Sequence, residues 1–240
     1  MPAKSTPTTR KPPSAQRFTR ALLAWYRKNA RDLPWRRTRD PYAVIVSEFM
    51  LQQTQVSRVL EYYPRFLKRF PTVYRLAAAK PRVVMESWEG LGYYARARNL
   101  HALAKEVSGV GGQVPDDPEE LMRLPGVGRY TAGAVASFAY EKPVPAVDTN
   151  VARVIARYFL GVGSREPSTP STRKRRLPTP DSREIWAIAG AIVPKNGRRA
   201  WAFNQAIMEL GARICVARKP KCSECPVRRG CKAAGRQGGA

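Results

Sequence analysis

All four cysteines of this 240-residue chain lie between positions 215 and 231, and this clustering limits what the C-terminal part can form. Their order is Cys215-x6-Cys222-x2-Cys225-x5-Cys231. Four thiolates from one tight loop can hold a metal centre, whereas structural disulfides are usually scattered along an exported chain. Zinc sites commonly show two separated short-spaced pairs, but here there is one short pair and the single histidine, His101, is distant. We expect a metal centre on these cysteines, with zinc or disulfides as alternatives.

The charge of the chain indicates its class of partner. Lys and Arg number 43 against 18 acidic residues, which gives a net charge of +25. Such an excess attracts polyanions and predicts nucleic-acid binding that weakens with salt. A generally basic composition without a nucleic-acid partner is the alternative. The sequence contains no uninterrupted run of about 18 apolar residues, so we expect no membrane span. The N-terminus lacks the apolar core of a secretory signal.

Helical periodicity is common along the chain and strand patterns are scarce, so we predict an all-α fold. Residues 1–15 and 236–240 are predicted to be disordered tails, and residues 163–182, rich in Pro, Ser and Arg, a mobile loop. An apolar stripe near the N-terminus and the Asp40-Pro41 cap mark two helices, the second running to about Thr54. Further helices are expected near 57–70, 72–79, 95–108, 117–123, 129–139, 148–160, 183–193 and 200–212.

The segment LPGVGRYTAGAVASFA (124–139) predicts a phosphate-binding turn between two helices. Gly126 and Gly128 let the backbone approach a ligand closely, and the free N–H groups of a helix that starts near Arg129 attract an anion. Such a helix-hairpin-helix turn would hold a DNA backbone phosphate without reading sequence. An ordinary helix–helix turn is the alternative.

Two acidic residues are candidates for chemistry. Asp148 precedes the apolar helix of VDTNVARVIARYFLG (147–161), at the N-cap position. A carboxylate kept ionised by a helix N-terminus can also stabilise positive charge on a deoxyribose. Glu48 lies among apolar helix neighbours, which raise a carboxyl pKa and suit a general acid. A capping Asp and a Glu at the rim of a core helix are the respective alternatives.

Two further segments are candidates for contact with bases. The polar run Gln52, Gln53, Thr54 and Gln55 lies next to the aliphatic part of the Glu48 helix and can probe base edges. The segment WEGLGYYARARNL (88–100) offers a wedge, Leu91 or Tyr93, to fill a base stack, and arginines, among them Arg96, to hold phosphates. A buried tyrosine pair is the alternative for this segment.

Together these segments resemble the MutY-type adenine DNA glycosylases of the helix-hairpin-helix, endonuclease III-like superfamily. The resemblance covers roughly residues 16–235 and rests on LPWR, SEFMLQQTQV, GLGYYARARNL, LPGVGRYTAGA, VDTNVARV, FNQAIMELGA and the cysteine loop, in family order. It implies a [4Fe–4S] cluster on Cys215, Cys222, Cys225 and Cys231. It also implies a two-lobed DNA glycosylase fold, with a barrel lobe at 38–142 and a cluster lobe of 16–37 plus 143–235.

The resemblance also assigns roles to individual residues. Glu48 would protonate the adenine and Asp148 would stabilise the oxocarbenium-like sugar, with Tyr130 and Asn150 supporting that site. Tyr93 would enter the duplex.

The residues that would face the opposite guanine or oxidised guanine are Gln52, Gln53 and Thr54. Bifunctional relatives carry lysine at position 130, and since tyrosine forms no Schiff base, we predict base removal by water alone.

Two departures from the adenine family leave the excised base open. The chain stops soon after Cys231, where adenine enzymes usually continue into a domain that recognises 8-oxoguanine, and Thr149 replaces their glycine. Thymine- or uracil-removing enzymes acting on G:T and G:U mispairs share both departures and RDLPWRRTRDPY. QQTQV and GLGYYARARNL favour adenine. A non-catalytic DNA-structure binder is a third hypothesis.

The expected partner is double-stranded DNA containing a mismatch. We expect the protein to be a monomer that does not bind a membrane, and to lie in the cytoplasm of a bacterium in association with the nucleoid.

Overall fold

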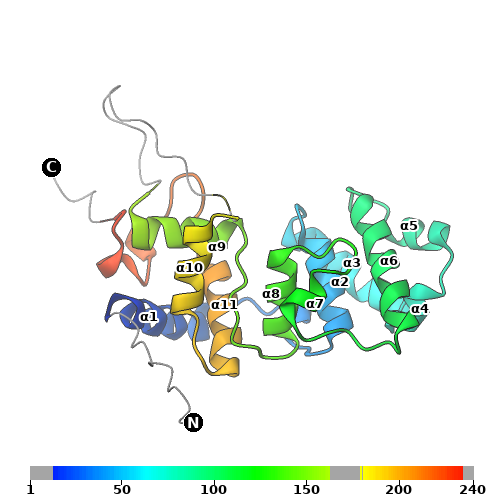
Figure 1. Ribbon diagram of the computed structural model, residues 1–240. Coiled ribbons are helices and arrows are strands. Elements are labelled where there is room, and N and C mark those ends of the chain that lie inside the picture. Colours follow the sequence, from blue (N-terminus) through cyan, green and yellow to red (C-terminus); the bar gives the residue numbers. More distant parts are fainter. Residues whose placement is uncertain (1–12, 163–178, 180, 235–240) are drawn as a thin grey trace, which may run out of the picture. The chain divides into compact units, whose positions relative to one another are not determined.

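The computed structural model describes residues 13–162, 179 and 181–234, and every regular element among them is helical (Figure 1). The all-α expectation is therefore confirmed for this part of the chain. The first helix begins at Pro13, inside the tail expected at 1–15, and Ala15 is already buried. The rest of that tail, residues 236–240 and nearly all of the 163–182 loop lie outside the described residues. None of the described helices is long and apolar enough to cross a membrane.

The helices and helical turns are α1 (Pro13–Asn29), η1 (Pro34–Arg36), α2 (Pro41–Leu51), α3 (Val56–Arg69), α4 (Val73–Ala77), α5 (Pro81–Trp88), α6 (Ala95–Gly109), α7 (Pro118–Leu121), α8 (Arg129–Phe138), α9 (Thr149–Ile155), the π-helical turn η2 (Ala156–Leu160), α10 (Arg183–Ile192), α11 (Gly197–Arg213), η3 (Cys222–Glu224) and η4 (Arg228–Gly230).

The chain divides into two compact units. The Glu48 unit comprises residues 31–146 and 195–201, and the cysteine unit comprises the described residues of 1–30, 147–194 and 202–240. Residues 31–37, 143–146 and 195–201 thus group with the Glu48 unit, although they were expected in the other lobe. Aromatic packing accounts for this difference, because the Trp35 ring meets Tyr63 edge-on at 5.5 Å and Arg39 lies 4.4 Å from the Trp201 ring.

Helix α2 is the centre of the Glu48 unit and packs against α3, α6 and α8. Asp40 caps it by accepting a hydrogen bond from the Tyr42 amide at 3.0 Å, and nine of its eleven residues are buried. A helix that is apolar all round belongs in a core. The helix ends at Leu51, three residues before the expected end, because the polar residues that follow turn away, with Gln53 at φ 55°.

Helix α5 is the element that the sequence pattern did not predict. Pro81 stands at its first position after Lys80, an arrangement that favours a helix start, and its last residue, Trp88, is completely buried. The eight-residue helix is too short to show a clear periodicity.

The core of the cysteine unit forms where α1 meets the segment after α9. The Phe18 ring lies 4.5 Å from the ring of Tyr158 and 6.2 Å from that of Phe203. The helix expected at 148–160 is α9 followed by the π-helical turn. The last carbonyls of this segment accept from the end of the cysteine loop, Tyr158 from the Lys232 amide and Arg157 from the Ala233 amide, both at 3.1 Å. Local π geometry often marks a functional site, and here it adjoins the cysteines.

Candidate active site and iron–sulfur centre

Glu48 and Tyr130 form the first candidate catalytic pair, within the Glu48 unit. Glu48 lies on α2 with only 4% of its surface exposed, and Tyr130 lies in the first turn of α8. The Tyr130 hydroxyl donates a hydrogen bond of 2.7 Å to Oε2 of Glu48. The sequence predicted only that Tyr130 supports the catalytic site, and this contact is consistent with that expectation. A carboxyl held in one rotamer by such a bond is well placed to deliver a proton.

Asp148 and Asn150 form the second pair, within the cysteine unit. Asp148 caps α9, as expected, through a 2.7 Å hydrogen bond from the Val151 amide to Oδ1. Its other oxygen, Oδ2, accepts from the Asn150 side-chain amide at 2.8 Å. Burial raises the pKa of Asp148, while the Val151 amide, the Asn150 amide and the positive charge of Arg153 act in the opposite direction. Burial outweighs the helix N-terminus, which the sequence analysis took as the dominant influence.

Arg153 connects this pair to the cysteine loop, a role that the sequence analysis missed. Its Nη2 donates to the Asn150 side-chain oxygen at 2.7 Å and to the Gly211 carbonyl at 2.8 Å. Its Nε donates to the Cys215 carbonyl at 2.8 Å. The orientation of the Asn150 amide is thereby fixed, because an amide oxygen that accepts from Arg153 turns its nitrogen towards Asp148.

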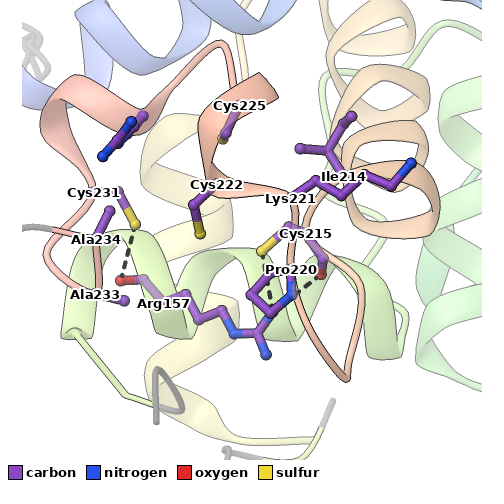
Figure 2. Close-up of a pocket in the computed structure, with 11 residues that line it drawn as sticks. Arg157, Ile214, Cys215, Pro220, Lys221, Cys222, Cys225, Cys231, Ala233 and Ala234 are labelled. Carbon is purple, nitrogen blue, oxygen red and sulfur yellow. Dashed lines mark hydrogen bonds between the residues drawn. The ribbon is translucent and has the colours of Figure 1, made fainter. Parts of the chain in front are cut away.

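The four cysteines surround one pocket of the cysteine unit (Figure 2). All four are free of disulfides, which removes that alternative. Among the described residues, no group of three or more His, Cys, Asp or Glu side chains is arranged to hold a single metal ion. Four thiols that ring a pocket are a ligand set for a [4Fe–4S] cluster and also for a single zinc ion.

Arg157 is the second arginine that the sequence analysis missed, and it holds one side of this pocket. The side chain is 5% exposed, and Figure 2 shows it reaching toward Cys215. Its guanidinium donates to the carbonyls of Val216 at 2.7 Å and Ala217 at 2.9 Å, and approaches the Cys215 Sγ at 3.4 Å. Arg153 and Arg157 stand four residues apart on an otherwise apolar helical segment, and this spacing could have revealed them.

Two of the thiols, those of Cys225 and Cys231, would not ionise readily by themselves. Burial raises the pKa of Cys225 to about 11, and it also raises the pKa of Cys231. Since iron binds the thiolate, the positive charge of the bound metal must supply the deprotonation.

The expected phosphate-binding turn lies between α7 and α8. Gly126 has φ +75°, and a Cβ there would lie 2.7 Å from the Asn99 Cβ and 3.0 Å from the Phe49 ring, so the close packing of this turn requires glycine. Gly128 precedes α8 without a side-chain cap, and a Cβ there would meet open space. Arg129 is exposed beside it. The uncapped amides at the start of α8 agree with the expected anion site.

The two expected base-contacting segments also lie in the Glu48 unit. Tyr93 is 62% exposed, and a wedge must be accessible in this way; its backbone has φ 48°. Leu91 is only 5% exposed and belongs to the core. Gln52, Gln53 and Thr54 form the turn after α2, where the Thr54 hydroxyl donates to the Gln52 carbonyl at 3.4 Å. Arg96 does not face solvent, so the expectation that it holds a phosphate is wrong: its guanidinium is buried among backbone carbonyls.

Sequence comparison finds similar proteins in animals and bacteria. The chain is 43% identical over 231 residues to an adenine DNA glycosylase of Rattus norvegicus, covering 92% of this chain and 42% of the relative. It is 44% identical over 226 residues to that of Homo sapiens, covering 90% and 39%. It is 44% identical over 209 residues to that of Mycobacterium tuberculosis, covering 86% and 64%. The chain therefore spans about two-fifths of the length of the mammalian relatives.

Solved structures with the same fold include two DNA repair enzymes. A thermostable thymine-DNA glycosylase superposes with a TM-score of 0.80 and 30% identity, covering 93% of this chain and 97% of that one. Endonuclease III in a non-covalent complex with DNA superposes with a TM-score of 0.71 and 25% identity, with the same coverage. These neighbours confirm the expected helix-hairpin-helix glycosylase fold.

Two family models match the segments described above. Residues 215–231, which contain Cys215, Cys222, Cys225 and Cys231, match the iron–sulfur binding domain of endonuclease III, so the protein carries a [4Fe–4S] cluster. Residues 46–178, more than half of the chain, match the model of HhH-GPD base excision DNA repair proteins, and the chain belongs to this HhH-GPD superfamily.

Proposed function

We propose that the protein is a monofunctional DNA glycosylase that removes adenine mispaired with guanine or 8-oxoguanine in double-stranded DNA. The observation that carries this proposal is the 2.7 Å hydrogen bond from Tyr130 to Glu48, which places a phenol, not an amine, beside the candidate general acid. The similar proteins named adenine DNA glycosylase support the choice of base.

In the proposed mechanism the two carboxyl groups have different tasks. Glu48 gives its proton to a ring nitrogen of adenine, and the bond between that base and C1′ breaks. Asp148, as a carboxylate, stabilises the positive charge that develops on the sugar. A water molecule then bonds to C1′ and returns its proton to Glu48, which leaves an abasic site.

The cluster has a structural part in this proposal. When bound, it cross-links the four thiolates of the 215–231 loop. The loop carries the exposed basic residues Arg218, Lys219 and Lys221, which would face DNA phosphates. The open start of α8 at Gly128 would hold a further phosphate.

The test offers one set of duplexes with A:8-oxoG, A:G, T:G and U:G pairs, followed by alkali. We expect cleavage of the adenine strand by the wild-type protein. The Asp148→Asn variant should lose turnover and keep DNA binding, since it retains a capping oxygen. A protein that binds these duplexes and cleaves none would be a non-catalytic binder and would overturn the proposal.

Removal of thymine or uracil opposite guanine is the second candidate. The observations that favour it are the 0.80 TM-score to a thymine-DNA glycosylase and the exposed Thr149 at the start of α9. Cleavage at T:G or U:G alone, in the same duplex set, would select this candidate. In either case borohydride should not trap the protein on substrate DNA, because Tyr130 has no amine to form a Schiff base.

A further inference from the structure

Arg96, in the first turn of α6, is a buried cation held by neutral acceptors. Its side chain is 7% exposed, and its guanidinium donates to five backbone carbonyls. Its Nε–H is buried and has no hydrogen-bond acceptor among the described residues. Desolvating an arginine is costly, and an apolar side chain of similar volume usually serves a purely structural position at least as well.

The five carbonyls belong to two different segments. Nη1 donates to Phe49 at 3.0 Å, to Met50 at 2.8 Å and to Gln52, which are the last turn of α2 and the residue after it. These carbonyls lack helical partners because the helix ends there. Nη2 donates to Leu91 at 3.1 Å and to Gly92 at 3.0 Å, in the turn that leads to Tyr93.

The same guanidinium also lies near the wedge itself. Its central carbon is 5.5 Å from the ring centre of Tyr93 and 5.5 Å from that of the buried Trp88. Tyr93 adopts φ 48°, a conformation that non-glycine residues keep only where their surroundings enforce it. Arg96 contacts the carbonyls of Leu91 and Gly92, directly before Tyr93, and also the Tyr93 ring. These contacts hold Tyr93 in this conformation.

We propose that Arg96 is a positioning residue that joins Tyr93 and the Gln52–Thr54 turn into one rigid recognition element. With this link, entry of the Tyr93 ring into the duplex and contact of the turn with the opposite base occur together. The proposal rests on the proposed function. The planar fork of arginine is needed, because the three donors of a lysine on a single nitrogen cannot reach both carbonyl groups at once.

The experiment is a double-mutant cycle on duplex affinity. Tyr93→Ala and Gln52→Ala are combined in an Asp148→Asn background, so that the A:8-oxoG duplex stays intact while its Kd is measured. With Arg96 present, the change in Kd of the double variant should differ about tenfold from the product of the two single changes. This corresponds to a coupling free energy of about 1.4 kcal/mol. With Arg96→Lys, the two single changes should multiply to within about twofold.

Matched controls separate positioning from general damage. Arg82→Lys changes an exposed arginine on α5 of the same unit and should leave the coupling intact. A second cycle pairs Tyr93→Ala with Arg129→Ala, at a turn that Arg96 does not contact, and should give multiplicative effects. This cycle needs no Arg96 variant and therefore stays informative if Arg96→Lys fails to fold.

Two outcomes would overturn the proposal. One is a Tyr93–Gln52 coupling that persists in Arg96→Lys, even where that variant melts at a lower temperature. The other is a coupling no larger than that between Tyr93 and Arg129. If the duplex set shows thymine to be the excised base, the cycle is run on a T:G duplex with the same criteria, so failure of the adenine assignment is distinguished from failure of the linkage.

Discussion

The Asp148 carboxyl is subject to opposing influences that substitutions can separate. Burial raises its pKa, and the Asn150 amide lowers it by donating to the charged form. Since Asp148 must be ionised to stabilise the sugar cation, the rate should fall as pH drops through this raised pKa. Asn150→Ala removes a donor to the carboxylate and should move the acid limb of the pH–rate profile to higher pH.

The measurement is single-turnover excision across pH for wild type and Asn150→Ala. At neutral pH the variant should also be about ten- to a hundredfold slower, since the carboxylate loses its alignment. Arg153→Gln should move the acid limb in the same direction, because it removes a positive charge near Asp148 and the hydrogen bond that the guanidinium donates to the Asn150 side-chain oxygen. An acid limb that moves to lower pH in Asn150→Ala would contradict the assignment of Asp148.

Tyr130→Phe tests the other carboxyl group. The variant keeps the ring and removes the hydroxyl that donates to Glu48 at 2.7 Å. Glu48 becomes a carboxylate as it gives up its proton, and a hydrogen bond to that charged group is worth about 1.5–3 kcal/mol, so excision should slow by about ten- to a hundredfold. Duplex affinity and iron content should not change. An unchanged single-turnover rate would show that this bond does not orient the general acid.

At the scale of elements, sequence pattern predicted the helices that begin with a defined cap. Asp40 and Asp148 stand at N-caps, as their positions indicated. Helix α5 was missed because it is short, and the π-helical turn after α9 was predicted as plain helix because its cause is a distant partner, the 232–233 backbone.

The same limit applies to single residues in the site. Spacing marked the four cysteines and the N-cap position marked Asp148, and the structure places the thiols around one pocket and Asp148 at the start of α9. Arg96 was expected to hold a phosphate, as arginines mostly lie at the surface. Three of its five acceptors lie more than forty residues away in sequence, and no local pattern reports them.

Arg157→Met tests the element that supports the iron–sulfur loop. The variant keeps the buried stem and removes donors to the carbonyls of Val216 and Ala217. A hydrogen bond to a charged group contributes about 1.5–3 kcal/mol, so loss of these bonds should loosen the cluster loop. We expect lower iron content, weaker visible absorbance of the cluster and faster iron loss to a chelator. Arg229→Met, at an exposed position of the same loop, is the control. Full iron retention in Arg157→Met would contradict this role.

At the scale of the whole molecule, net charge sets the affinity for any DNA, while particular residues set the preference among duplexes. The +25 charge should give a logarithm of Kd that rises linearly with the logarithm of salt concentration.

Arg129→Ala, at the open start of α8, should reduce that slope by about one and weaken matched and mismatched duplexes equally. Gln52→Ala should leave the slope unchanged and weaken only the mismatched duplex, because it removes a base contact and no charge. The measurement is Kd for both duplexes across a salt series. A loss of mismatch preference in Arg129→Ala would show that the start of α8 does more than hold a phosphate. A changed salt slope in Gln52→Ala would show that the Gln52–Thr54 turn does more than recognise a base.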